Sequence, residues 1–487
     1  MKYHDSQSVV RIKTAADLLG VTTQTVRNWV SAGRLKAARH PINGYRLFRR
    51  QDIERLMTPG YVPGESGAVG RDAMSKAPTS STGINSTRPR LREDAELNYQ
   101  AVCTDFSDEV ELAAQRDREW LLRSSAPNSG GSSKQLVIGD AFCGGGIFSL
   151  GAERGLRSAG FCVSHSFGID FDQDSINTFR HNFPKSKCEH ADITSIIDGK
   201  IGEKSTASER SFLSRVSNRL DVLLGGPPCQ GHSDLNNHTR RSDPKNELYL
   251  SMVRLAELLN PRVIIIENVP GVVHDKGGVV HAANNWLERL GYAVSSKLFD
   301  LSKIGVPQRR RRFVLVASKK VRVDLEAIDQ ANSVPPRAVS WAIEDLLDKY
   351  DELSVYNSSS THSAENQRRI RYLFAHDLYE LPNSQRPPCH RNGNHSYHSV
   401  YGRMHWDAPA PTITGGFGST GQGRFVHPRL PRTLTPHEAC RLQFIPDFFI
   451  FPDSVKRRSM QQIIGNAAPP KLSEIVLSGI AKQGVLQ

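Results

Sequence analysis

The sequence predicts a doubly wound α/β domain, preceded at the N-terminus by a small winged helix-turn-helix domain. Two observations lead to this fold class. From residue 134 onward, short apolar runs alternate with helical segments, a pattern typical of parallel strands joined by crossover helices. Closer to the N-terminus, two short helical segments precede a hairpin signal. A chain of 487 residues is long enough for two or three domains, so both predictions can hold together.

The pattern of the smaller domain lies within residues 1–57. KTAADLLGV and TTQTVRNWVSAG predict two successive helices with a turn between them. Val26, Trp29 and Val30 share one face of the second helix and should pack on the first. The dipeptide NG that follows is a hairpin signal, so we expect a β-hairpin wing after the helices.

The same stretch resembles the MerR-type winged-helix DNA-binding domain in the run AADLLGV…TVRNW…GYRLF. It carries 11 Lys and Arg against 4 Asp and Glu, a balance of +7 out of a formal net charge of +13 for the whole chain. The second helix of such a domain enters the major groove of DNA. The alternative, a module that docks another protein, remains open. The candidate DNA contacts are Gln24, Thr25, Arg27 and Asn28 on the helix and Arg46 on the wing.

Residues 58–133 predict a flexible linker, because they are rich in Gly, Ser, Pro and Thr and poor in apolar residues. Within this linker, residues 108–122 have the pattern of a short amphipathic helix. No apolar run in the chain approaches the roughly 20 residues of a membrane helix, and the N-terminus lacks the apolar core of a secretory signal. We therefore expect a cytoplasmic protein without a membrane partner.

The α/β region ends its strands in residues that suit ligand binding, which takes place beyond the carboxyl ends of such strands. The first strand candidate ends in Asp140 and runs into the glycines of AFCGGGIFSLG. The second ends in Asp170, with Phe171 beside it, and this combination indicates an adenosine-bearing cofactor. The dinucleotide pattern GxGxxG is not met, since Ser149 stands where the third glycine should be. The alternative is that both acids cap helices. The strand candidates are 136–140, 163–170, 221–225, 263–267, 293–299 and 312–318.

The loop GGPPCQGHSD presents Cys229 on a stiff and bare backbone, because proline fixes φ and glycine lets another molecule approach closely. The alternative is a tight turn whose cysteine fills a gap. Seven cysteines without a CxxC pair argue against a disulfide framework, so this thiol is expected to stay free.

Charged side chains mark two further strands. Glu267 ends the apolar run VIIIE, where burial would raise its pKa and suit it to share a proton with a ring nitrogen. Gln308, Arg310 and Arg312 alternate into the last strand candidate, and a period of two sends their side chains to one face. The alternatives are a glutamate that caps the next turn and a solvated run of charge.

Together these residues resemble the DNA (cytosine-5)-methyltransferases. DAFCGGG, GGPPCQGHS, ENVPG, GVPQRRRR, RTLTPHEACRLQFIPD and QIIGNAAPP appear in the order of that family, from about residue 134 to the end of the sequence. The resemblance implies a Rossmann-like methyltransferase sheet over residues 134–318 and a target-recognition domain over 319–430. It also implies that residues 431–487 return to the catalytic core.

The resemblance also implies a mechanism. The thiolate of Cys229 would attack carbon 6 of a cytosine flipped out of double-stranded DNA, and carbon 5 would take the methyl group of S-adenosylmethionine. Glu267 would bind N3 and the amino group, Arg312 would bind O2, and Arg310 would help to order the site. The implied cofactor-binding residues are Phe142, Gly144, Gly146, Asp170, Phe171, Asp192, Pro227 and Asn466. The implied substrate-binding residues are Pro228, Gln230, Gly231, Asn268 and Gln308.

The net charge of +13 favours a polyanionic partner such as DNA. In the Gly-rich stretch before residue 430, Arg424 and His427 are candidates for contacts to DNA. A cognate restriction endonuclease is a further candidate partner, and we expect the chain to act as a monomer. No metal site is expected, because the spacing of Cys389, His390, His395 and His398 fits no zinc pattern.

Two other functions compete with this interpretation. One is a transcriptional regulator that uses a degenerate methyltransferase fold, which is disfavoured because Cys229, Glu267, Arg310 and Arg312 are all present. The other is an RNA cytosine-5 methyltransferase, against which the winged helix argues, since such domains bind duplex DNA.

Overall fold

The computed structural model describes residues 9–19, 21, 26, 29–30, 35–39, 46–49, 52–53, 109–127, 134–217, 219–228, 248–274, 278–391 and 399–487. The chain forms two compact units, Met1–Glu96 and Leu97–Gln487, and each is considered by itself. None of the described helices is both long and apolar enough to span a membrane.

The first unit contains a three-stranded antiparallel sheet with the order β1-β3-β2. The strands are β1 (Val9–Arg11), β2 (Ala38–Arg39) and β3 (Arg46–Arg49), and helix α1 (Ile12–Leu19) follows β1 directly. Val26 is fully buried in the small core, and Trp29 and Val30 pack against that core. The predicted apolar face of the second helix is therefore confirmed.

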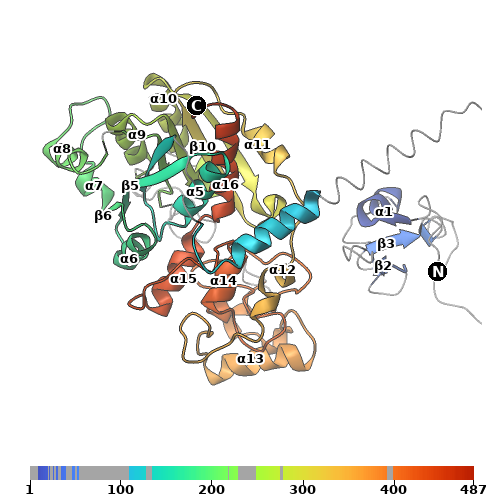
Figure 1. Ribbon diagram of the computed structural model, residues 1–487. Helices are drawn as coiled ribbons and strands as arrows, with labels where there is room; N and C mark the ends of the chain where they lie inside the picture. Colours follow the sequence, from blue (N-terminus) through green and yellow to red (C-terminus); the bar gives the residue numbers. More distant parts are fainter. Residues whose placement is uncertain are drawn as a thin grey trace, which may run out of the picture. The chain divides into compact units, whose positions relative to one another are not determined.

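The second unit is built on a seven-stranded sheet with the order β6-β5-β4-β7-β8-β10-β9 (Figure 1). All neighbouring strands are parallel except around β10, which runs antiparallel to both β8 and β9. The predicted doubly wound α/β class is confirmed, and the short edge strand β6 was not among the predicted strands. In sheet order the strands are β6 (Lys187–His190), β5 (Cys162–Asp170), β4 (Gln135–Ala141), β7 (Val222–Gly225), β8 (Val263–Asn268), β10 (Arg311–Ser318) and β9 (Ala293–Asp300).

Helices cover both faces of the sheet, because the central strands are apolar on both sides. In β8, Val263 and Ile265 belong to one buried cluster, whereas Ile264 and Ile266 belong to another. The helices of the second unit are α5 (Ile147–Ser158), α6 (Gln173–Asn182), α7 (Ile193–Ile196), α8 (Ala207–Leu213), α9 (Leu248–Leu259), α10 (Val279–Arg289), α11 (Leu325–Ala331), α12 (Val339–Ile343), α13 (Ala364–Ala375), α14 (Pro436–Leu442), α15 (Arg457–Asn466) and α16 (Pro470–Lys482).

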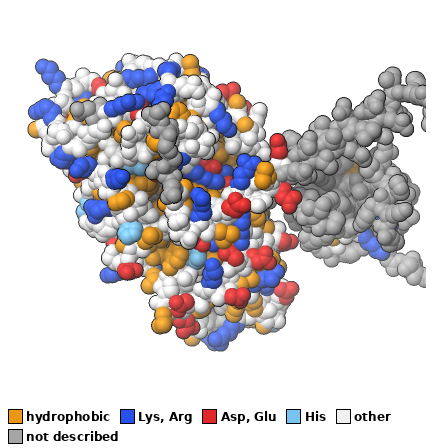
Figure 2. All heavy atoms as spheres, in the orientation of Figure 1, with side chains coloured by type: hydrophobic (Ala, Val, Ile, Leu, Met, Phe, Trp, Pro, Cys, Tyr) orange, Lys and Arg blue, Asp and Glu red, His pale blue; other side chains and the backbone are white. Residues whose placement is uncertain are grey.

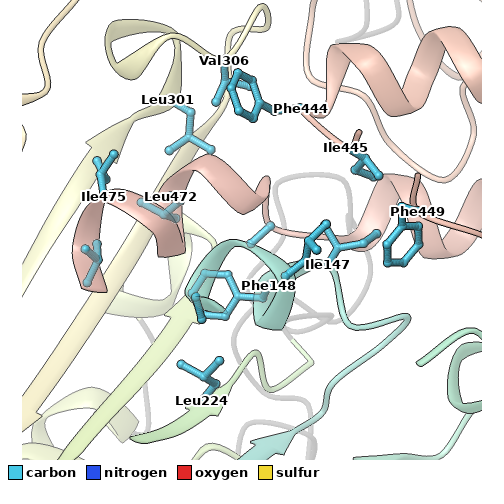
Figure 3. Packing of buried hydrophobic residues seen from close by; sticks show 14 of the residues in the cluster. Ile147, Phe148, Leu224, Leu301, Val306, Phe444, Ile445, Phe449, Leu472 and Ile475 are labelled. Atoms are coloured by element: carbon cyan, nitrogen blue, oxygen red, sulfur yellow. The ribbon is translucent and has the colours of Figure 1, made fainter. Parts of the chain in front are cut away.

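The last helix, α16, packs on α5, the first helix after β4, as Figure 3 shows for their apolar side chains. Glycines make this approach possible. A Cβ atom at Gly151 would lie 1.8 Å from the carbonyl oxygen of Pro470, and one at Gly155 would lie 2.3 Å from that of Glu474. The two backbones are therefore in direct contact, and no larger residue fits at either position.

The helical residues 109–121, cyan in Figure 1, belong to the second unit rather than to a linker. Trp120 and Leu121 are buried in the main apolar cluster, and the Trp120 ring meets that of Phe448 edge to face at a centroid distance of 5.0 Å. The sequence predicted this helix but placed it in the flexible segment between the domains.

Residues 319–430 contain little sheet. Their helices, α11 to α13, are joined by long connections, and a small apolar cluster of Ile370, Leu373, Leu381 and Val426 lies under α13. The alternation of strands and helices thus stops after β10, where the sequence pattern also changes.

Candidate active site

The centre of the site is an ion pair between two neighbouring strands. Glu267 lies near the carboxyl end of β8, and Arg312 lies at the beginning of the antiparallel strand β10. Because β10 enters where β8 ends, the two side chains meet, with 2.7 Å between Arg312 Nε and Glu267 Oε1. Burial raises the pKa of Glu267 above its usual range, although Arg312 and Arg310 oppose the rise. The carboxyl group of Glu267 is therefore protonated more readily than that of an exposed glutamate, and it is better suited to donate a proton.

The loop that leads to Cys229 begins beside this pair. Strand β7 neighbours β8, and the chain leaves β7 through Gly226, Pro227 and Pro228. A Cβ atom at Gly226 would lie 3.4 Å from Glu267 Oε2, so the loop backbone passes close to the carboxyl group.

Asn268 supports the start of this loop, because its Nδ2 donates a hydrogen bond to the carbonyl oxygen of Pro227 at 3.3 Å. Pro227 is buried and Pro228 is half-buried. Cys229, Gln230 and Gly231 lie outside the described residues, so their predicted roles stay predictions.

Arg310 is not a member of the ion pair between Glu267 and Arg312. Instead, its side chain joins the surrounding chain segments. Its buried guanidinium donates hydrogen bonds to the carbonyl oxygens of Ile413 at 2.8 Å, Gly465 at 3.1 Å and Ala467 at 2.9 Å. These acceptors come from chain segments more than 100 residues further on. These hydrogen bonds suit a positioning role, the one that the resemblance implied for Arg310.

The substrate-binding interpretation of Gln308 needs correction. Its side chain is fully buried, Nε2 donates to the carbonyl oxygen of Leu442 at 2.9 Å and to Gln443 Oε1 at 2.6 Å, and Oε1 accepts from the amide of Ile413 at 3.1 Å. Both ends of the amide are used within the protein. Gln308 thus holds the arginine segment against later parts of the chain.

A second group of predicted residues lies at the carboxyl ends of β4 and β5. Asp170 ends β5, and its carboxylate accepts hydrogen bonds from the amides of Gly144 at 2.8 Å and Asp172 at 3.0 Å. Burial raises the pKa of Asp170, although these amides oppose the rise. Gly144 has a φ of +51°, and a Cβ atom there would meet nothing within 4 Å, so the loop leaves open space at this point. Phe171 is 67% exposed, which is unusual for a large apolar side chain.

Asp140 is a second buried acid in this group, and its partner was not predicted from the sequence. Ser149 Oγ donates a hydrogen bond of 2.6 Å to Asp140 Oδ2. Burial raises the pKa of Asp140 to about 7, and the nearby charge of Asp170 adds to this effect. The missing third glycine was the available signal, since Ser149 takes that position and uses its hydroxyl to bind the acid.

The remaining cofactor candidates are more dispersed. Phe142, in the loop after β4, has a left-handed backbone with a φ of 60°. Gly146 allows the ring of Phe183 to pack against the backbone, because a Cβ atom at Gly146 would lie 2.5 Å from that ring. Asp192 is exposed and caps α7 by accepting from the amide of Thr194 at 3.0 Å, and Asn466 is exposed at the end of α15.

The residues predicted to contact DNA lie in both units, and only some of them are among the described residues. Gln24, Thr25, Arg27 and Asn28 lie outside the described residues, and Arg46 begins β3 opposite Arg39. On the face of the second unit drawn in Figure 2, Lys and Arg side chains are interspersed with Asp and Glu.

Arg424 and His427 are not disposed to bind DNA in this structure. The Arg424 side chain is only 15% exposed, pairs with Glu380 and donates to the carbonyl oxygens of Tyr379 at 3.1 Å and Arg403 at 3.2 Å. His427 is fully buried, and burial lowers its pKa to about 4, so it is neutral. Both DNA-contact interpretations are therefore corrected to structural roles.

Among the described residues, no cluster of His, Cys, Asp and Glu has a geometry suited to a metal ion. Cys389 and His390 are described, but the other two members of the group considered from the sequence are not.

Comparison with known proteins agrees with this geometry. The family model for C-5 cytosine-specific DNA methylases matches residues 136–482, and a helix-turn-helix model matches residues 9–60. Type II methyltransferase M1.BsuMI of Bacillus subtilis is 46% identical over 360 residues, which cover 74% of this chain and 84% of that protein. Type II methyltransferase M1.HphI of Haemophilus parahaemolyticus is 29% identical, over 71% of this chain and 87% of that protein.

Among solved structures, one described as a DNA modification methyltransferase encoded within an Escherichia coli prophage is similar, with a TM-score of 0.51 and 25% identity. The match covers 71% of this chain and 99% of that one. The similarities thus extend over the whole sheet and the segments that follow it. The chain belongs to the C-5 cytosine-specific DNA methylase family, as a DNA methyltransferase of restriction-modification type with a helix-turn-helix domain at its N-terminus.

Proposed function

We propose that this enzyme transfers a methyl group from S-adenosylmethionine to carbon 5 of a cytosine flipped out of double-stranded DNA, through a covalent adduct with Cys229. The observation that carries the proposal is the buried pair of Glu267 and Arg312 beside the start of the loop that leads to Cys229. Glu267 and Arg312 thus lie on the neighbouring strands β8 and β10, and Cys229 follows β7, the strand on the other side of β8.

The chain's own residues would activate the base in the following way. The thiolate of Cys229 forms a bond to carbon 6, and the electron pair displaced from the ring is received at N3, where the Glu267 carboxyl group supplies a proton. The raised pKa of Glu267 favours the protonated form that this step needs. Arg312 would face O2 and offset negative charge there.

S-adenosylmethionine supplies the electrophilic methyl group when it is bound, and the residues at the ends of β4 and β5 fit such a molecule. The Asp170 carboxylate accepts hydrogen bonds from nearby amides at both oxygens, and its remaining lone-pair capacity suits a ribose hydroxyl group. The exposed ring of Phe171 offers a face on which adenine can stack, and Gly144 leaves the backbone accessible.

After transfer, which leaves S-adenosylhomocysteine, a water molecule takes the proton from carbon 5, and the electron pair of that bond forms the double bond to carbon 6 and expels Cys229 as a thiolate. Glu267 takes back the proton from N3. The cytosine must leave the base stack first, at a cost of a few kcal/mol, because stacking hides both faces of its ring. The partners proposed with this function are duplex DNA and a cognate restriction endonuclease, and the enzyme would act as a cytoplasmic monomer.

The test is the product in cellular DNA. After expression of the full chain in a host without cytosine methylation, bisulfite sequencing should show 5-methylcytosine at one short motif, and the Cys229→Ser variant should leave the DNA unmodified. Unmodified DNA from cells that contain soluble wild-type protein would contradict the proposal and favour the regulator.

A further inference from the structure

The helix at residues 109–121 precedes the segment matched by the family model, which begins at residue 136. This helix carries Asp117, which is only 4% exposed. The Asp117 carboxylate contacts three cationic side chains. Asp117 Oδ1 lies 3.2 Å from Arg154 and 2.9 Å from Lys471, and Oδ2 lies 2.8 Å from Arg337. Burial raises the pKa of Asp117, but the three cations outweigh it and the pKa lies below its usual range.

The three cations depend on Asp117 to different degrees. Arg154 and Lys471 both also pair with Glu474, at 2.8 Å and 3.2 Å, so they keep a counter-ion if Asp117 is neutralised. Arg337 is buried as well, and in the described part of the chain no other carboxylate lies within 4 Å of it. A buried cation without a counter-ion is strongly unfavourable, and among the described residues only the Trp341 ring, whose centroid is 4.3 Å from Arg337 Cζ, and neutral oxygens would remain beside the guanidinium, so we expect it to shift.

The other end of the Arg337 guanidinium reaches the segment that carries the catalytic arginine. Its Nη1 donates to the carbonyl oxygen of Gly305 at 3.1 Å. Gly305 has a φ of +94°, and a Cβ atom there would lie 2.9 Å from Arg337 Cζ, so glycine is required for this close contact. Gly305 opens the run GVPQRRRR, in which Arg312 follows seven residues later.

The backbone between Gly305 and Arg312 is restrained by hydrogen bonds to other segments. The amide of Arg309 donates to the carbonyl oxygen of Ala410 at 2.8 Å, and the carbonyl oxygen of Arg310 accepts from the amide of Leu301 at 2.8 Å. A change in the backbone at Gly305 must therefore be accommodated within a short stretch whose other hydrogen bonds leave few alternative conformations, and Arg312 lies at its end. The helix itself is firmly held, because Leu121 is fully buried and its carbonyl oxygen accepts from the amide of Asp447 at 2.9 Å.

We propose that Asp117 is a positioning residue for the methylation reaction: through Arg337 it holds Gly305, and thereby sets the placement of Arg312 opposite Glu267. The proposal rests on the proposed function. It means that a residue N-terminal to the family segment contributes to the geometry of the active site.

The first experiment compares Asp117→Asn with Glu119→Gln in the full-length protein. Both variants neutralise one acid on the same helix, but Glu119 is exposed. In Asp117→Asn we expect kcat for methylation to fall by about 10- to 100-fold, because small misplacements at a reacting centre have effects of this size. The KM for S-adenosylmethionine should change by less than about twofold, since Asp170 and Phe171 are not in the chain of contacts. Glu119→Gln should match the wild type.

A double-mutant cycle tests whether Asp117 acts through Arg337. Arg337→Met alone removes the contact to Gly305 and should lower kcat to a similar extent, without leaving a buried charge at that position. In the Arg337→Met background, Asp117→Asn should cost less than about a further twofold, because the connecting residue is already gone. Independent, multiplicative losses would overturn the proposal. If Asp117→Asn fails to fold, an unchanged kcat in Arg337→Met has the same meaning.

Amide hydrogen exchange separates this proposal from the proposed function, because it needs no activity. Residues 301–313 should exchange at least tenfold faster in Asp117→Asn than in Glu119→Gln, even if the wild type methylates no DNA. Equal exchange in the two variants, or equal kcat in an enzyme that is active, would refute the positioning role while leaving the methyltransferase function intact.

Discussion

Neutralising Asp140 should remove a pH dependence of stability that this residue causes. The pKa of Asp140 is raised from 3.8 to about 7 in the folded protein, mainly by burial. A raised pKa means that the folded state favours the protonated acid, so its contribution to stability is complete below pH 4 and is lost as the pH rises through 7. At about 1.4 kcal/mol for each pKa unit, ionisation at pH 8 lowers the free energy of unfolding by about 4 kcal/mol.

The assay is urea unfolding of the wild type and of Asp140→Asn between pH 4 and pH 8. An asparagine keeps the shape of the side chain and an oxygen that can accept from Ser149, but it cannot ionise. The difference in the free energy of unfolding between variant and wild type should therefore shift in favour of the variant by about 4 kcal/mol from pH 4 to pH 8. Asp348→Asn, at an exposed acid, is the matched control and should show no such shift. A difference that is constant across this range would refute the assignment of a buried, protonated Asp140.

Three further predictions concern catalysis, DNA binding and packing. Cys229→Ser should abolish methylation but keep DNA binding, and 5-fluorocytosine at the target should trap the wild type covalently, as seen by denaturing electrophoresis; an adduct with the variant would place the nucleophile elsewhere. Deleting residues 1–57 should leave the methylated motif unchanged but weaken DNA affinity and its salt dependence in binding titrations, because a charge of +7 is lost; a changed motif would contradict this division. Gly151→Ala should destabilise the second unit by about 3 kcal/mol or more in urea unfolding, since its Cβ atom would lie 1.8 Å from the carbonyl oxygen of Pro470; a loss below about 1 kcal/mol would refute the close packing.

The sequence predicted the sheet and singled out Glu267 and Arg312 as site residues, largely because local patterns determine both. Apolar runs gave six of the seven strands, and Glu267 and Arg312 stood at strand ends, where side chains from neighbouring strands meet. The pattern carried no information on strand direction, and the antiparallel course of β10 is what brings Arg312 to the end of β8.

Residues governed by distant contacts were harder to predict. A period of two assigned Gln308 and Arg310 to one face of a strand, but β10 begins only at Arg311, so both lie before it and bind segments far along the chain. Arg424 looked available for DNA because its partner Glu380 is 44 positions away. For the same reason no sequence pattern singled out Asp117, since its partners lie in three remote segments.

The contact between α5 and α16 has a consequence for how the protein is made. Roughly 300 residues separate the two helices, and at about 5–20 residues per second their synthesis takes about 15–60 s. Until α16 leaves the ribosome, the face of α5 around Gly151 and Gly155 has no partner, and apolar residues such as Leu150 and Leu156 remain accessible to chaperones and proteases. A nascent chain therefore completes its methyltransferase core only after α16 has been synthesised, and we expect a chain truncated before α16 to lack the fold that methylation needs.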